Sequence, residues 1–171
     1  LLPVIISKTT EVIDAERSSL FIYDEETNEM WSKVAEGMDS KEIRFPVGVG
    51  IAGDVAKTLK TVNIPDAYKD DRFNPAFDKE TNYRTKSILC MPMLNNEGAL
   101  VGVVQVLNKK DGSTFDDKDE SLLEALSVQA GVAIQRARLL EAFVEKQRIQ
   151  ESLKLAADIQ MGMLPKDFPA F

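Results

Sequence analysis

The chain contains no histidine among its 171 residues. Histidine is the commonest metal ligand in proteins and the usual general base near neutral pH. Its absence excludes haem ligation by histidine and removes the leading candidate for acid–base catalysis. The hydroxyl and carboxylate residues that remain show no pairing of a nucleophile with a base and no arrangement typical of a catalytic metal site. The sequence therefore predicts no catalytic residue and no metal ligand.

Cysteine is nearly absent as well, because Cys90 is the only one. A single cysteine cannot form an intrachain disulfide, so the reducing cytoplasm is the expected compartment. Cys90 lies in an apolar run, which predicts a position in the core.

The chain also lacks long apolar runs and an excess of basic residues. No stretch approaches the roughly 18 apolar residues of a membrane span, and the amino end has neither the basic region nor the apolar segment of a signal peptide. The net charge is -7 and the basic residues are interspersed with acidic ones, a pattern that argues against nucleic acid as a partner. The first residue is Leu1, so we expect the chain to be part of a longer protein.

The apolar run from Leu100 to Leu107 is rich in valine and leucine, which predicts a buried β-strand. Gln105 is a polar side chain within this run. A buried amide without a hydrogen-bond partner costs about 1 to 3 kcal/mol. Gln105 is therefore expected either to bond to nearby backbone or to face a polar cavity.

Periodicity and turn residues predict further elements on both sides of this strand. Helices are expected over 2–16, over 50–58 and from an N-cap at Thr114 onward; strands are expected over 18–24, 30–36, 42–46 and 87–94. Residues 62–86 are irregular and rich in Pro, Asp and Asn, which predicts a lid over a pocket. The order of elements predicts an α+β fold, an antiparallel sheet with helices on one face and a long C-terminal output helix.

Two glycines, Gly50 and Gly53, begin the helix predicted over 50–58. The free backbone amides of such a helix start favour an anion. The alternative is that the glycines allow a tight turn and close packing against the sheet. No lysine follows the second glycine, so a loop of the nucleotide-hydrolysing type is not predicted.

The last predicted helix carries an apolar stripe at spacings of three and four residues up to Val144. The next apolar position is Ile149, five residues later. Such a jump is typical of a coiled-coil discontinuity, and the alternative is a helix that continues exposed. We expect one domain over 1–140 and a helical linker over 141–171.

Five short motifs follow one another along the chain. They are Gly50-Ile51-Ala52-Gly53, Val62-Asn63-Ile64-Pro65-Asp66-Ala67-Tyr68, Asp71-Arg72-Phe73, Ser87-Ile88-Leu89-Cys90-Met91-Pro92, and Asn108-Lys109 followed by Phe115 and Asp119-Glu120. In the same order, they resemble the motifs of GAF domains similar to the ones in cyclic-nucleotide phosphodiesterases and some adenylyl cyclases. The resemblance covers residues 1–140.

This resemblance implies a ligand-sensing regulatory module that binds a cyclic nucleotide, cAMP or cGMP. The ligand-binding residues that it implies are Ser19, Ala35, Glu36, Ile51, Ala52, Asp78, Thr81, Thr85 and Gln105. Ala35 departs from the pattern because it offers no aromatic ring to stack on a base. A structural clasp of Asn108, Lys109, Phe115 and Asp119 is also expected, in which Lys109 pairs with Asp119 and ties the last strand to the output helix.

A second resemblance covers about fifteen residues near the carboxyl end. Residues 156–165, with Ile159-Gln160 and Leu164-Pro165, and the following Phe168-Pro169 are similar to the segment that leads into SpoIIE-type Ser/Thr phosphatase domains of bacterial regulators. It implies that the longer protein continues into a metal-dependent phosphatase beyond Phe171.

The expected output is a homodimer formed through the terminal helices, in which the helix signals to that phosphatase. The alternative function is a dimerisation and protein-interaction module that binds no small molecule. Catalysis by this chain itself is the least favoured function.

Overall fold

The computed structural model describes residues 2–35 and 42–162. Six strands and four α-helices follow one another along these residues, with one short 3-10 helix between them. Their bounds are α1 Leu2–Ile13, β1 Ala15–Asp24, β2 Glu29–Ala35, β3 Ile43–Pro46, α2 Gly50–Thr58, β4 Val62–Ile64, η1 Ala67–Lys69, α3 Ala76–Thr81, β5 Ile88–Leu94, β6 Leu100–Lys109 and α4 Asp117–Gly162.

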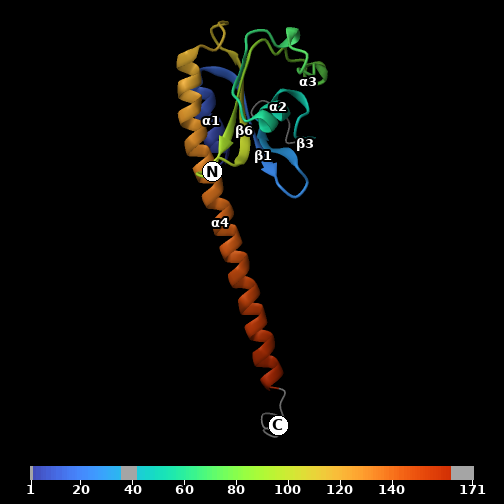
Figure 1. Cartoon of the computed structure of the whole chain (residues 1–171), viewed down its shortest axis with the longest axis vertical. Helices are drawn as coiled ribbons and strands as arrows, with labels where there is room; N and C mark the ends of the chain where they lie inside the picture. The colour runs from blue at the N-terminus through green and yellow to red at the C-terminus, as the bar shows by residue number, and fades with distance from the viewer. Residues whose placement is uncertain (1, 36–41, 163–171) are drawn as a thin grey trace. The chain divides into compact units, whose positions relative to one another are not determined.

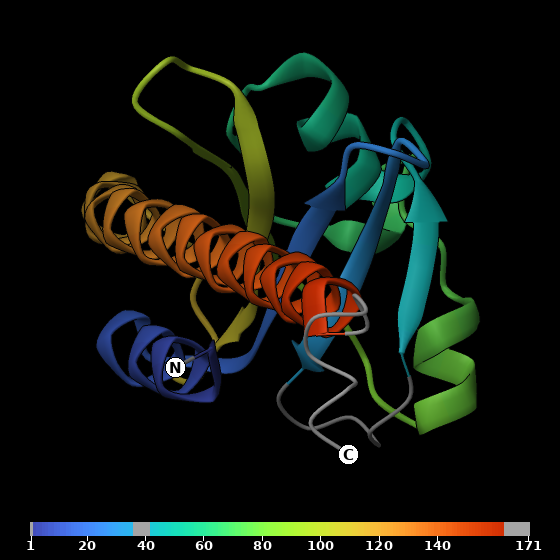
Figure 2. The ribbon, with the colours of Figure 1, turned by 90° about the horizontal axis from the view of Figure 1, so that it is seen from below.

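The strands form one antiparallel sheet in the order β3-β2-β1-β6-β5-β4. Strands from the two halves of the chain meet at its centre, where Ser19 of β1 pairs with Gln105 of β6. Figure 2 shows β1, β2 and β3, coloured blue to cyan, next to one another. The α+β class and the antiparallel sheet predicted from the sequence are confirmed.

The prediction that the helices lie on one face of the sheet is wrong. The Thr10 hydroxyl of α1 donates a hydrogen bond to Ser18 Oγ on one face, at 2.7 Å. On the other face, Phe21 belongs to a core cluster with Ile51, Ala52, Val55 and Ala56 of α2. Figure 1 shows α1 and the first turns of α4 on one side of β1 and β6, and α2 on the other. Both faces need cover because Leu20, Phe21 and Ile22 are consecutive and all buried.

The central strands approach each other very closely at Gly102. A Cβ atom at this position would lie 2.3 Å from the carbonyl oxygen of Phe21. No other residue type fits there without moving β1 away from β6, so Gly102 fixes the contact between the two strands that form the floor of the cavity described below.

Several boundaries differ from the sequence prediction, and two of them have a clear cause. The first helix ends at Ile13 rather than at residue 16, because Asp14 adopts a left-handed conformation with φ 59° and β1 begins at Ala15. Residues 62–64 form β4, which pairs with β5, although they were predicted as part of the lid. A segment of only three residues becomes a strand because a neighbouring strand pairs with it. Its sequence is too short to show the periodicity of a strand.

The N-cap of α4 is Asp116, and the prediction of Thr114 is wrong. The backbone N–H of Asp119 donates to Asp116 Oδ1 at 2.9 Å, and the N–H of Asp116 donates to Asp119 Oδ2 at 3.0 Å. This reciprocal arrangement is a capping box. The same backbone bond lowers the pKa of Asp116 below its usual range.

The chain divides into two compact units, Leu1–Ala133 and Ile134–Phe171. Within the first unit, α4 buries Leu123, Ser127 and Ala130. Gly131 permits a close approach as well, because a Cβ there would lie 3.0 Å from the Leu94 carbonyl oxygen.

In the second unit, every side chain from Leu139 to Gly162 is exposed. Met163, Leu164-Pro165 and Phe168-Pro169 of the predicted linker lie outside the described residues. No helix among the described residues has both the length and the apolar character needed to cross a membrane.

Candidate ligand-binding site

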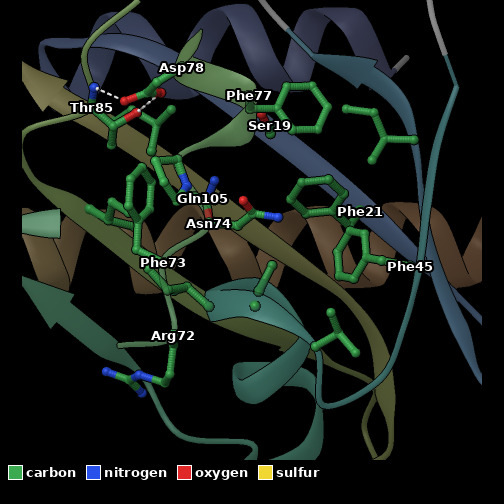
Figure 3. Close-up of a pocket in the computed structure, with 18 of the residues that line it drawn as sticks. Ser19, Phe21, Phe45, Arg72, Phe73, Asn74, Phe77, Asp78, Thr85 and Gln105 are labelled. Atoms are coloured by element: carbon green, nitrogen blue, oxygen red, sulfur yellow. Dashed lines mark hydrogen bonds between the residues drawn. The ribbon is translucent and has the colours of Figure 1, made fainter. Parts of the chain in front are cut away.

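A cavity of about 570 Å³ lies on the face of the sheet that α2 covers. Its floor is formed by β1 and β6, one wall by the beginning of α2, and its cover by residues of the segment 65–86, which we call the lid. Figure 3 shows side chains from all three parts around the same space. The volume falls within the range of about 300 to 1,000 Å³ that is usual for small-molecule sites.

The floor of the cavity combines polar and aromatic side chains. Alternation along β1 turns Arg17, Ser19 and Phe21 to the same face, and pairing places Gln105 of β6 beside Ser19. Ser19 is only 6% exposed. Among the described residues, neither Ser19 nor Gln105 has a side-chain hydrogen-bond partner. The structure thus agrees with the second of the two alternatives for Gln105, in which its side chain faces a cavity.

The wall contributed by α2 consists of Gly50, Ile51 and Ala52. Val49 precedes the helix and provides no side-chain cap, so the first amides of α2 are available to a ligand. Gly53 has the packing role given as the alternative, because a Cβ there would lie 3.1 Å from the backbone of Pro46 and Gly48.

The lid contacts α2 through an ion pair. Arg72 Nη1 lies 2.8 Å from Asp54 Oδ2 on α2, and the same guanidinium binds Asp70 with Nε at 2.9 Å and Nη2 at 2.7 Å. These bonds lower the pKa of the Asp70 carboxyl and raise the pKa of Arg72. Phe73 follows at once, lines the cavity, and packs against Tyr68 with ring centroids 5.1 Å apart.

A second, buried contact fastens α3. Asp78 Oδ1 accepts a hydrogen bond from the Thr85 hydroxyl, and Oδ2 accepts bonds from the Thr85 N–H and the Tyr68 hydroxyl, at 2.6 to 2.7 Å. The bond to Asp78 raises the pKa of the Tyr68 hydroxyl. Both oxygens of Asp78 are therefore engaged within the lid, so this residue shapes the cavity through Thr85 and Tyr68.

The carboxyl end of the lid is held by a network around Tyr83. The Tyr83 hydroxyl donates to Glu16 at 2.7 Å and accepts a bond from Asn108 Nδ2 at 2.9 Å. The guanidinium of Arg17 lies 3.7 Å from the centre of the Tyr83 ring. Burial, together with the bond to Glu16, raises the pKa of Tyr83, and the same bond lowers the pKa of Glu16.

The structure brings most of the predicted ligand-binding residues together. Those that line the cavity are Ser19, Ile51, Ala52, Asp78, Thr81, Thr85 and Gln105. Ala35 is placed by register alone, opposite Ser19 in the neighbouring strand. Glu36 lies outside the described residues.

Sequence reasoning missed several residues of the cavity, notably Arg17, Arg72 and Tyr83. Arg17 precedes Ser19 by two positions, so strand alternation alone could have placed it on the same face. Arg72 belongs to the Asp71-Arg72-Phe73 motif, so the motif itself could have indicated this residue. Tyr83 carries no local signal, because its position depends on partners from Glu16 and Asn108, far away in sequence.

The predicted clasp lies away from the cavity, since none of its four residues lines it. Lys109 Nζ is 2.6 Å from Asp119 Oδ1 and 3.1 Å from the carbonyl oxygen of Ile13. Burial alone would lower the pKa of Lys109, but the bond to Asp119 and the charges of the nearby carboxylates of Asp119, Asp116 and Asp111 together outweigh burial, and the pKa is raised. The carbonyl oxygen of Phe115 accepts a bond from Asn63 Nδ2 at 2.9 Å.

The cavity has little of what covalent or metal chemistry needs. Cys90 is fully buried in the sheet, outside the cavity lining, and burial raises the pKa of its thiol. Within residues 2–35 and 42–162, no group of three or more carboxylate or cysteine side chains is arranged to hold a metal ion. The arrangement suits reversible binding of a small molecule with polar edges.

Comparison with curated proteins identifies phosphodiesterases as relatives. The chain is 42% identical over 143 residues to the dual 3',5'-cyclic-AMP and -GMP phosphodiesterase 11A of Takifugu rubripes, an alignment that covers 77% of this chain and 16% of that protein. It is 44% identical over 122 residues to the cGMP-specific 3',5'-cyclic phosphodiesterase of Drosophila melanogaster, covering 70% of this chain and 11% of that protein. The chain thus spans less than a fifth of the length of either relative.

Solved structures show the same fold. The GAF domain of a phosphoenolpyruvate-protein phosphotransferase from Coxiella burnetii superposes with a TM-score of 0.73 at 22% identity, over 81% of this chain and 83% of that one. The family model described as GAF domain matches residues 1–134. With its six-stranded antiparallel sheet and covered cavity, this chain belongs to the GAF domain family.

Proposed function

We propose that this chain is a ligand-sensing regulatory module that binds a cyclic nucleotide, cAMP or cGMP, in the cavity under the lid. The observation that carries the proposal is the cavity itself. It holds two polar side chains, Ser19 and Gln105, that have no hydrogen-bond partner among the described residues, opposite the uncapped start of α2.

The chemistry of these walls suits a purine with a cyclic phosphate. Ser19 and Gln105 can donate and accept hydrogen bonds, which is what the edge of a base requires. The amides at the start of α2 favour the phosphate. Phe21, Phe45 and Phe73 supply the apolar contacts that the base needs, even though Ala35 lacks an aromatic ring. The relatives named as cyclic-nucleotide phosphodiesterases support the same ligand class.

Binding is tested by the melting temperature of the purified chain in the presence of cAMP or cGMP. A ligand that binds only the folded state at about a hundred times its Kd stabilises that state by about 2.7 kcal/mol, so we expect a rise of about 5 °C or more. No shift with either nucleotide at millimolar concentration would contradict the proposal.

The variant Gln105→Ala tests whether the ligand binds in this cavity. The Gln105 side chain makes no hydrogen bond to a described residue, so we expect normal stability and a Kd about five- to thirtyfold higher, the loss of one or two hydrogen bonds to the ligand. Gln129→Ala, on the exposed face of α4, is the control. Thr85→Ala should weaken binding too, and if it and Gln105→Ala both bind normally, the ligand lies elsewhere.

We further propose that the module acts in the cytoplasm as a homodimer and that its output helix controls a SpoIIE-type phosphatase domain in the same protein. The support for the phosphatase is the resemblance of residues 156–169, part of which lies outside the described residues. Phosphatase assays on the longer protein, with and without cyclic nucleotide, test this link; unchanged activity would contradict it.

The exposed side chains of α4 favour a second candidate, a dimerisation and protein-interaction module that needs no ligand. Large apolar side chains that are more than half exposed recur along the helix, at Leu139, Leu140, Phe143, Val144, Ile149, Leu153, Leu155, Ile159 and Met161. Apolar surface of this extent is typical of a protein interface. A dimer whose stability does not respond to either nucleotide would favour this candidate over the first.

A further inference from the structure

The lid is fastened at two places that differ in burial. The inner contact joins Asp78 to Thr85, two residues that are 7% and 2% exposed. The outer contact joins Arg72 to Asp54 of α2, whose side chains are 38% and 30% exposed. Figure 3 shows Asp78 and Thr85 at one edge of the cavity and Arg72 at another.

The two contacts also differ in whether a charged group loses all its partners when the contact breaks. Asp70 holds Arg72 by two bonds and lies in the same lid segment, so it stays with Arg72 when the contact to Asp54 is lost. The arginine therefore never becomes an unpaired charge. Separation of Asp78 would instead remove three hydrogen-bond donors from a buried carboxylate, which is costly.

The space behind the outer contact is the cavity. Phe73, Asn74 and Pro75 follow Arg72 and line it from the lid, while Gly50 and Ile51 line it from the helix that carries Asp54. Movement of the 71–75 segment away from α2 would therefore open the cavity without displacing α3.

We propose that the Arg72–Asp54 ion pair is the edge at which the lid opens, so that a small molecule passes between residues 71–75 and α2 while Asp78 keeps α3 fastened. Arg72 is then a positioning residue that controls how fast the cavity exchanges its contents. The passage of a cyclic nucleotide rests on the proposed function; the opening of the lid does not.

Thiol labelling measures the opening without any ligand. Ser19→Cys places a thiol on the cavity floor, at a residue that is only 6% exposed, so its labelling by a small neutral maleimide reports access to the floor. Cys90, buried in the sheet of the same chain, reports global unfolding. The ratio of the two labelling rates separates lid opening from loss of the fold.

We expect Asp54→Asn in this background to raise the labelling rate of Ser19→Cys about two- to fivefold, as the loss of a partly exposed ion pair implies, and to leave Cys90 unchanged. Asp66→Asn is the matched control, because it removes the same charge from an exposed pair with Lys69 within the lid. Raising the salt concentration from about 0.05 M to about 0.5 M should speed labelling in the Ser19→Cys chain and have little effect once Asp54 is replaced.

Three results would overturn the proposal. In the first, Asp54→Asn leaves the labelling rate of the Ser19→Cys thiol unchanged. In the second, Asp54→Asn speeds labelling of Ser19→Cys and of Cys90 equally, and in the third, the Ser19→Cys thiol is labelled no faster than Cys90. With cAMP as the probe, Asp54→Asn should raise the dissociation rate by the same factor as the labelling rate. If cAMP does not bind, the proposed ligand is wrong, and the labelling rates still decide whether the lid opens at this edge.

Discussion

Asn108 shows how much of the lid's position depends on a single side chain. Its Oδ1 accepts hydrogen bonds from the N–H groups of Lys86 and Ser87, at 2.6 and 3.1 Å. Its Nδ2 donates to Glu16, to the Tyr83 hydroxyl and to the Arg84 carbonyl oxygen, at 2.9 to 3.1 Å. The backbone has φ 56°, a conformation that asparagine tolerates better than most residues. Asparagine thus meets a backbone and a side-chain requirement together.

Because of Glu16, the stability that this network provides should depend on pH. The folded state lowers the pKa of Glu16 below its usual value of 4.5, chiefly through the bond from Tyr83. A lowered pKa means that the carboxylate stabilises the fold fully above the unfolded value and loses this contribution as the pH falls through the folded value. We expect the stability advantage over Glu16→Gln to be constant above about pH 6 and to shrink below pH 4.5.

Urea denaturation of both proteins at several pH values measures this difference. Glu11→Gln, on the exposed side of α1, is a suitable comparison. An advantage over Glu16→Gln that stays the same at low pH would show that Glu16 does not need its charge in the network.

At the level of elements, Lys109 joins three of them. It lies at the end of β6, donates to the last residue of α1 through the Ile13 carbonyl, and pairs with Asp119 in the first turn of α4. The side chains of the pair are only 15% and 6% exposed. Both helices on this face of the sheet are thus positioned by one cation.

Replacement of Lys109 by alanine should therefore destabilise the fold strongly. Removing one partner leaves a buried carboxylate without its cation, and we expect a loss of about 2 to 4 kcal/mol in the free energy of unfolding. Lys57→Ala, which removes an exposed lysine from α2, should change it by no more than about 0.5 kcal/mol. Equal losses for the two variants in denaturant titrations would contradict a structural role for the clasp.

Elements with a strong local pattern could be predicted from the sequence, and those defined by distant partners could not. The run of Leu100 to Leu107 and the periodic start of α4 required no other information. The three residues of β4 are a strand only because β5 lies beside them, and the end of α1 depends on the conformation of Asp14. Helices on both faces follow from Leu20, Phe21 and Ile22 all being buried, which becomes evident only in the sheet.

The candidate site divides in the same way. The predicted residues on β1, α2 and β6 came from the resemblance to GAF domains, and the structure places Ser19, Ile51 and Gln105 around one cavity. The inner fastening of Asp78 could not be foreseen, because it requires the folded path of the lid to bring Thr85 and Tyr68 to the same carboxylate.

At the level of the whole molecule, the proposed dimer can be tested directly. The exposed apolar side chains of α4 between Leu139 and Met161 provide a surface for a second copy, and a parallel pairing would bring equivalent side chains together. Sedimentation equilibrium at tens of micromolar should give about twice the chain mass of 19.0 kDa. The double substitution Leu140→Ser and Val144→Ser should shift the equilibrium toward monomer, whereas Glu141→Gln between them should not.

A single species at 19.0 kDa would exclude the dimer at that concentration. The apolar stripe changes phase between Val144 and Ile149, so two registers of a paired helix can be close in energy. If a bound ligand selects one of them, distances between spin labels at Ser152 should change at saturating cyclic nucleotide. Unchanged distances would contradict a signal carried by a register shift.

The two edge strands of the sheet, β3 and β4, limit uncontrolled association between copies of the chain. β3 has four residues and ends at Pro46, and β4 has three and is followed by Pro65. Arg44 places its charge on β3, where it bonds to Asp24 and Glu29. Short, charged and proline-terminated edges offer little backbone to a foreign strand, which protects a protein from fibril growth. High concentrations in storage should therefore favour helix-mediated oligomers over β-rich aggregates.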